Sequence, residues 1–110
     1  MVLYTDLMPK RFDGYNLGPV TLIRPSHKTD AALHAHEAVH RRQFLRNPLM
    51  GLFYLCSASA RQAYEAEAYR AQLALQPGSV NVLATFLSTR YGLTLTHAEA
   101  VALLTKKESC

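Results

Sequence analysis

Two histidines in the sequence HEAVH, His36 and His40, constrain the fold more than any other feature of this chain. Residues four apart lie one turn above each other on an α-helix, so the two imidazoles project from the same face. Apolar residues flank the motif, and either Thr29 or Asp30 can cap the helix by accepting a hydrogen bond from a backbone N–H of the first turn. We therefore expect a helix over residues 30–46 that presents both imidazoles to one side.

The remaining pattern predicts an α+β fold that is mostly α, with about four helices behind a small N-terminal β element. The apolar stretches MVLYT and PVTLI, at 1–5 and 19–23, favour short strands. The segment between them contains Pro and Gly and favours a loop or a wide hairpin. A second helical stretch is expected over about 50–76, with its better-defined part starting near Ser59 in a capping box.

Two further helices are expected in the C-terminal third of the chain. One runs over residues 79–91 and ends at Gly92, which can adopt the left-handed conformation that follows many helices. The other starts after Thr96, because Thr96 and Glu99 form a second capping box. We predict one domain over residues 1–110, since this length fits a single hydrophobic core.

The most apolar stretch, Leu49 to Ala60, is too short to span a bilayer, which needs about 20 residues. We expect it to form a buried helix segment in which Cys56 acts as a small buried hydrophobe. Cys56 and Cys110 do not by themselves fix the redox compartment. The net charge of +4 permits contact with anions, but no run alternates basic with aromatic residues, so nucleic-acid binding is not expected.

The HEAVH motif predicts a metal site with an open position. Zn²⁺ takes imidazole nitrogens at about 2.0–2.1 Å in a tetrahedral arrangement, which His36 and His40 can offer. Glu37 lies beside the same face and can act as general base and acid for a metal-activated water. The alternatives are an exposed helix with chance spacing, or a structural zinc site, for which neither cysteine lies at a useful spacing. The remaining histidines are expected on the surface: His27, His34 and His97.

A third metal ligand is expected from the later helix, where two carboxylates occur in AYEAEAYR. Glu65 and Glu67 point to different sides of that helix, so only one is expected to bind the ion. Glu65 follows His40 by enough residues for the chain to turn and come back antiparallel. The alternative for Glu65 is a surface carboxylate one turn from Arg61. Tyr69 lies one turn after Glu65 on the same face.

The motif, Gln43 soon after it and YEAEAYRAQ at 64–72 together resemble the gluzincin metallopeptidases, especially the very small phage and prophage members. The resemblance covers residues 20–76 and implies a single minimal gluzincin-like domain. It implies Glu65 as the third zinc ligand and Glu67 as its neighbour. Two differences stand out. The chain has no room for the separate domain of the larger enzymes, and Tyr69 stands where many relatives carry an Asp that supports a ligand histidine.

The resemblance implies a zinc metallopeptidase, a hydrolase of peptide bonds in which Glu37 serves as the base. Among the candidate phenols, Tyr69 is preferred over Tyr54 and Tyr64 as the donor that stabilises the oxyanion, although aromatic residues at helical spacing are commonly core residues. The stretch Val20–Arg24 is expected to be an edge strand that pairs with an extended peptide. The expected substrates are peptides or proteins, including cell-wall peptides.

A different class of protein is the first alternative: a non-catalytic phage virion or assembly protein, for example tail-associated, that keeps the zinc-binding fold. Other phage proteins would then be its partners. A weaker alternative is nucleic-acid binding through Arg41, Arg42 and Arg46. The N-terminus lacks the pattern of a secretory signal, so host cytoplasm and virion are the locations expected for a phage-encoded protein.

Overall fold

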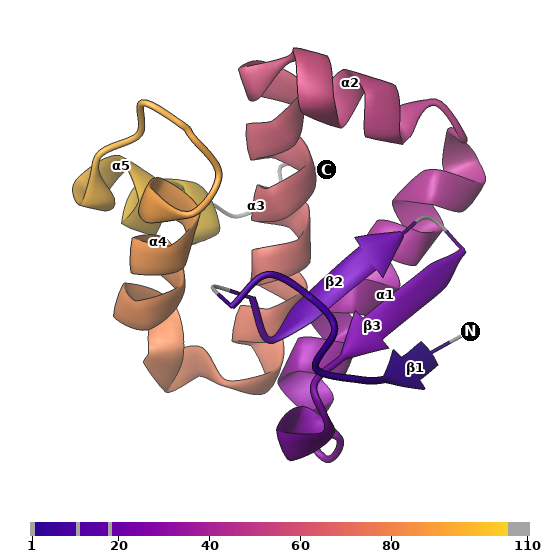
Figure 1. Ribbon diagram of the computed structural model, residues 1–110. Helices are drawn as coiled ribbons and strands as arrows, with labels where there is room; N and C mark the ends of the chain where they lie inside the picture. The colour runs from indigo at the N-terminus through magenta and orange to yellow at the C-terminus, as the bar shows by residue number, and fades with distance from the viewer. Residues whose placement is uncertain (1, 11, 18, 106–110) are drawn as a thin grey trace.

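The protein is mostly helical with a small N-terminal sheet, as the sequence predicts, in a computed structural model that describes residues 2–10, 12–17 and 19–105. The sheet lies over α1, whereas α4 and α5 lie beside α3 on its other side (Figure 1). The strands and helices in chain order are β1 (Val2–Tyr4), β2 (Gly14–Leu17), β3 (Val20–Ile23), α1 (Ala31–Arg46), α2 (Met50–Cys56), α3 (Ala58–Leu75), α4 (Val80–Thr89) and α5 (His97–Thr105), with 3-10 turns at Pro25–His27 and Pro77–Ser79.

The sheet has the strand order β1-β3-β2, with β1 parallel and β2 antiparallel to β3. Strands β1 and β3 confirm the two predicted stretches, but β2 lies inside the segment that was expected to be a loop or wide hairpin. β3 is therefore the central strand, and the prediction of Val20–Arg24 as an edge strand is wrong. The reason is that both edges of β3 are already paired, and β2 takes the outer position.

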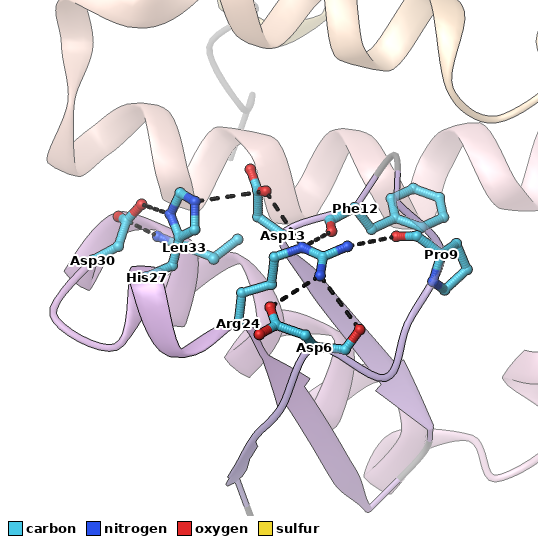
Figure 2. Close-up of polar contacts among 8 residues, drawn as sticks. All are labelled: Asp6, Pro9, Phe12, Asp13, Arg24, His27, Asp30 and Leu33. Atoms are coloured by element: carbon cyan, nitrogen blue, oxygen red, sulfur yellow. Dashed lines mark hydrogen bonds and ion pairs between the residues drawn. The ribbon is translucent and has the colours of Figure 1, made fainter.

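The chain between β1 and β2 is held against β3 by one arginine (Figure 2). Arg24 donates from Nε to the carbonyl of Phe12 at 2.9 Å and from Nη2 to the carbonyl of Pro9 at 3.0 Å. Its Nη1 also donates to the carboxylate of Asp6 at 3.1 Å. The planar guanidinium can satisfy these acceptors together, and it thereby fixes the segment that leads into β2.

Helices α1 and α3 pack side by side, and each begins at a side-chain cap. Asp30 accepts from the backbone N–H of Leu33 at 3.0 Å, which decides between the two predicted caps of α1. Ser57 accepts from Ala60 N–H at 3.1 Å and starts α3, so the expected start near Ser59 is wrong by one half-turn. The predicted helical stretch over 50–76 is thus two helices, because the extended backbone of Ser57 separates α2 from α3.

The apolar core lies among α3, α4 and α5. Leu83 and Leu87 of α4 are almost fully buried and pack with Ala100 and Leu104 of α5. Thr96 and Glu99 exchange side-chain hydrogen bonds with each other's backbone N–H, which confirms the predicted capping box of α5. Gly92 has a φ of +66°, the left-handed conformation expected for it after α4.

Helix α2 contradicts the prediction of a buried segment. It crosses the end of α3 at the top of Figure 1, and Met50 is its only buried residue. Leu52, Phe53 and Leu55 are exposed, and so is Cys56, which was expected to be buried. The sequence misled here because an apolar run predicts burial only if another element covers it. Cys110 lies outside the described residues, and none of the described helices is long and apolar enough to cross a membrane.

Candidate metal centre

The contact between α1 and α3 brings together the three predicted metal ligands. His36 and His40 project from α1, Glu65 projects from α3, and all three are buried. Oε1 of Glu65 lies 3.2 Å from Nε2 of His36 and 3.0 Å from Nε2 of His40. The ligand atoms all lie within 4.8 Å of one another, so this group can hold a metal ion.

The separations suit a small ion with tetrahedral coordination. Donors at about 2.0–2.1 Å from such an ion lie about 3.3–3.4 Å from one another. The two oxygen–nitrogen separations at Glu65 are within a few tenths of an ångström of that value. Two imidazoles and one carboxylate make three protein ligands, which leaves a tetrahedral ion one position for another group.

Glu65 is oriented by a phenol from α2. The hydroxyl of Tyr54 donates to Oε2 of Glu65 at 2.5 Å. This contact holds one carboxylate oxygen away from the histidines and leaves Oε1 directed at both imidazoles. The alternative of a surface carboxylate paired with Arg61 is therefore wrong. Arg61 instead donates to the backbone carbonyls of Tyr54 and Tyr91.

His40 is oriented from its other ring nitrogen. Nδ1 of His40 lies 2.9 Å from Oε1 of Gln43, so an N–H at Nδ1 donates to the amide oxygen and leaves Nε2 free to bind an ion. The amide nitrogen of Gln43 donates to Glu67 at 2.7 Å, and Glu67 also accepts from Arg46 at 3.1 Å. Glu67 thus supports His40 through Gln43.

Unlike His40, His36 is held by packing against an aromatic ring and not by a hydrogen bond at Nδ1. Its Nδ1 is buried without a hydrogen-bond partner in the described part of the chain. The ring of Tyr69 packs edge-on against the His36 ring, with centroids 4.3 Å apart. The Tyr69 hydroxyl lies 2.6 Å from that of Tyr91. The aromatic ring of Tyr69 therefore fixes the imidazole by packing.

The buried ligands form a strongly coupled charge pair. Burial alone would lower the pKa of His40, but the Glu65 carboxylate beside it raises that pKa to about 9. Burial alone would raise the pKa of Glu65, but the attraction of His40 and hydrogen bonds from both imidazoles hold that pKa well below its usual range. A buried carboxylate that stays ionised beside two imidazoles is the charge arrangement that a cation site needs.

Glu37 lies next to this group without belonging to it. Its carboxyl group is buried, and burial raises its pKa against the attraction of His36 and His40. Strand β2 passes directly over it, because a Cβ added at Gly14 would lie 2.9 Å from Oε2 of Glu37. Any side chain at Gly14 would have to displace the Glu37 carboxylate. A carboxyl group with a raised pKa exchanges protons more readily near neutral pH.

A cavity of about 370 Å³ opens onto these residues. Its polar floor consists of His36, Glu37, His40 and Glu65, and β2 forms one wall. Apolar side chains dominate the rest of the lining: Phe12, Leu17, Phe44, Pro48, Met50, Leu55 and Tyr91. Tyr54 also lines the cavity, whereas Tyr69 lies behind His36 and does not. An open coordination position would therefore face a space that a small organic group can enter.

The other histidines lie outside the cavity. His27 lies between Asp13 and Asp30, at 3.5 and 3.2 Å from their carboxylates (Figure 2). His34 is bonded to the Asp30 carbonyl at 2.7 Å and to the Tyr4 hydroxyl. Exposed His97 contacts a backbone carbonyl of α4. His27 and His34 are half-buried and paired, so they are less exposed than the sequence suggested.

Three residues of the site were not predicted from the sequence to contact a candidate ligand or Glu37. Gly14 lies in a segment that reads as a loop, and nothing local relates it to Glu37. Tyr91 follows α4 and reaches the cavity only because α4 packs on α3. Gln43 is three residues after His40, which is a helical neighbour spacing, so this supporting contact could have been found from the sequence.

Comparison with protein families, with curated proteins and with solved structures finds no match to this chain.

Proposed function

We propose that the protein is a zinc metallopeptidase of the gluzincin type that hydrolyses peptide bonds. Zinc is favoured over other ions because two imidazoles and one carboxylate are a donor set of catalytic zinc sites, and thiolates are not part of it. The observation that carries the proposal is the position of Glu37. It is buried beside the three ligands, faces the same cavity and has a raised pKa. A site kept only for stability has no use for such a group.

A zinc ion held there would lower the pKa of a water towards 7 and polarise the carbonyl of the bond to be cleaved. Glu37 accepts the proton of the attacking water as the new C–O bond forms. It then delivers that proton to the amine nitrogen as the C–N bond breaks, so the carboxylate is regenerated. Its raised pKa makes both transfers easier near neutral pH.

The phenol pair Tyr69 and Tyr91 supplies a donor for the oxyanion. Their hydroxyls are 2.6 Å apart, and burial raises both pKa values, so both stay protonated. Because Tyr91 lines the cavity, we assign the contact with the substrate oxygen to Tyr91 and the support of that hydroxyl to Tyr69. Tyr54 is occupied in holding Glu65.

An extended peptide fits along β2. This strand is at the edge of the sheet and also forms a wall of the cavity. In an antiparallel ladder, residue pairs that are hydrogen-bonded alternate with pairs that are not. The backbone N–H of Arg24 donates to the carbonyl of Asp13, so Asp13 belongs to a hydrogen-bonded pair. The next residue, Gly14, therefore directs its N–H and C=O away from β3. A peptide backbone paired there would pass next to Glu37. The substrate edge is thus assigned to β2 in place of Val20–Arg24.

The test compares the wild-type protein with Glu37→Gln on a peptide library, with the zinc content of each measured. We expect equal zinc and a fall in the hydrolysis rate of about 100- to 10,000-fold in Glu37→Gln, the usual range for a general base. Glu99→Gln, at an exposed position of α5, is the matched control and should keep full activity. Wild-type protein that holds zinc yet cleaves no peptide would contradict the proposal and favour a non-catalytic role.

A further inference from the structure

The connection between α1 and α3 carries a group of five exposed apolar side chains. Leu45 at the end of α1, Leu49 before α2, and Leu52, Phe53 and Leu55 of α2 form what we call the α2 face. Their exposed fractions range from 46% for Phe53 to 77% for Leu55. Such a concentration within a few turns marks an interaction surface, because proteins ordinarily expose apolar residues singly and scattered over the surface.

The architecture keeps this surface uncovered. Met50 and Tyr54 turn inward, where Met50 is buried and Tyr54 bonds Glu65, so the inner side of α2 is anchored to the site. The opposite side of α2 faces away from α3 at the top of Figure 1. Hence the exposed residues are held in place on a helix that cannot roll over to bury them.

Cations outnumber acidic groups in the chain around the α2 face. Residues 38–64 contain four arginines and no Asp or Glu, although the whole chain has a net charge of only +4. Arg46 pairs with Glu67 and Arg41 donates to the Thr21 hydroxyl of β3, but Arg42 forms no ion pair within the described residues. Arg42 is exposed on the last turns of α1, the same end that carries Leu45. Apolar residues bordered by cations are the pattern of a segment that lies in a membrane interface.

We propose that the α2 face docks on an anionic phospholipid surface, with its Leu and Phe side chains among the acyl chains and Arg42 against the lipid phosphates. A second copy of the chain is a poorer occupant. A symmetric contact would place the same arginines opposite one another, and no acidic group of the face would offset them. Because Leu55 also lines the cavity, docking would bring the cavity mouth to the lipid surface. The proposal does not depend on the peptidase activity.

The experiment measures sedimentation of the full chain with phosphatidylcholine vesicles, with and without phosphatidylglycerol. We expect binding only when phosphatidylglycerol is present, and weaker binding as salt is added. The double variant Leu52→Ser/Phe53→Ser should bind these vesicles at least about tenfold more weakly, from the loss of inserted apolar area. Arg42→Ser should bind about fivefold more weakly.

The matched control is Leu75→Ser/Val82→Ser. Leu75 and Val82 are exposed to 59% and 53%, close to 58% and 46% for Leu52 and Phe53, but they lie away from α2. This control should bind vesicles like the wild type, and circular dichroism of every variant establishes that it is folded. Absence of binding to anionic vesicles, equal loss in both double variants, or a dimer that only Leu52→Ser/Phe53→Ser dissociates would each overturn the proposal.

Discussion

The contact between α1 and α3 buries polar side chains, whereas α2, which joins these two helices in the chain, exposes apolar ones. His36, His40, Glu65 and Gln43 are each at most 6% exposed, while Leu55 is 77% exposed. Both arrangements lower the stability of the folded state, because burial of charges and exposure of apolar side chains are each unfavourable. Departures of this kind are expected where binding, rather than stability, determines the residue type.

The core among α3, α4 and α5 shows the ordinary distribution by contrast. It consists of Tyr69 and of small and branched apolar residues, and α5 begins at the capping box of Thr96 and Glu99. The two sides of α3 therefore have different roles. The C-terminal helices stabilise α3 from one side, and the other side of α3 is free to hold Glu65 among polar groups.

The largest expected effect is on zinc affinity at the polar contact between α1 and α3. Glu65→Gln removes a ligand and should weaken zinc binding by at least about 1,000-fold, beyond the 10- to 100-fold typical of groups that only support a ligand. Glu67→Gln, two residues further along α3, acts through Gln43 and should stay within that lower range. Competition with a chelating dye measures both affinities. Equal effects of the two variants would contradict the assignment of Glu65 as the ligand.

The next largest effect is on the free energy of unfolding when a leucine is truncated to alanine, at Leu87 or at Leu52. Leu87→Ala leaves a cavity in the core of α4 and should lower the free energy of unfolding by about 2–5 kcal/mol. Leu52→Ala on α2 should change it by no more than about 0.5 kcal/mol, because the side chain is already exposed. Urea denaturation of both variants measures the difference. A large loss at Leu52 would mean that α2 is covered in solution.

A smaller effect is expected where β2 approaches the polar contact. A methyl group at Gly14 would displace the Glu37 carboxylate, so Gly14→Ala should lower the hydrolysis rate by up to about 100-fold. Zinc affinity should stay the same, because Gly14 does not approach the three ligands. Gly51→Ala, with nothing near its added Cβ, is the matched control and should change neither quantity. Loss of zinc in Gly14→Ala would show a structural effect instead.

The smallest effect, about tenfold for each pH unit, is on the pH dependence of zinc affinity. In the metal-free protein His40 has a pKa of about 9, so it carries a proton at pH 7 that zinc must displace. Glu65, with its lowered pKa, stays ionised throughout. Affinity should therefore rise about tenfold per pH unit from pH 7 and level off near 9. Titration in buffers of different pH, with a competing chelator, measures this slope; a flat profile would contradict the coupling of His40 to Glu65.

The sequence predicted those parts of the fold that depend on neighbours within one helical turn. The same-face placement of His36 and His40, the cap at Asp30, the capping box at Thr96 and the left-handed Gly92 are all confirmed. These features follow from contacts between residues no more than four positions apart, which the order of residues alone specifies. The bonding of Gln43 to His40 belongs to the same class.

Only the tertiary structure decided which distant groups meet. It brought Glu65 rather than Glu67 to the histidines, placed β2 rather than β3 at the sheet edge, and set Tyr91 against Tyr69. It also left α2 exposed, although its sequence resembles that of a buried helix. Burial and long-range pairing depend on which elements pack together, and local residue patterns do not contain that information.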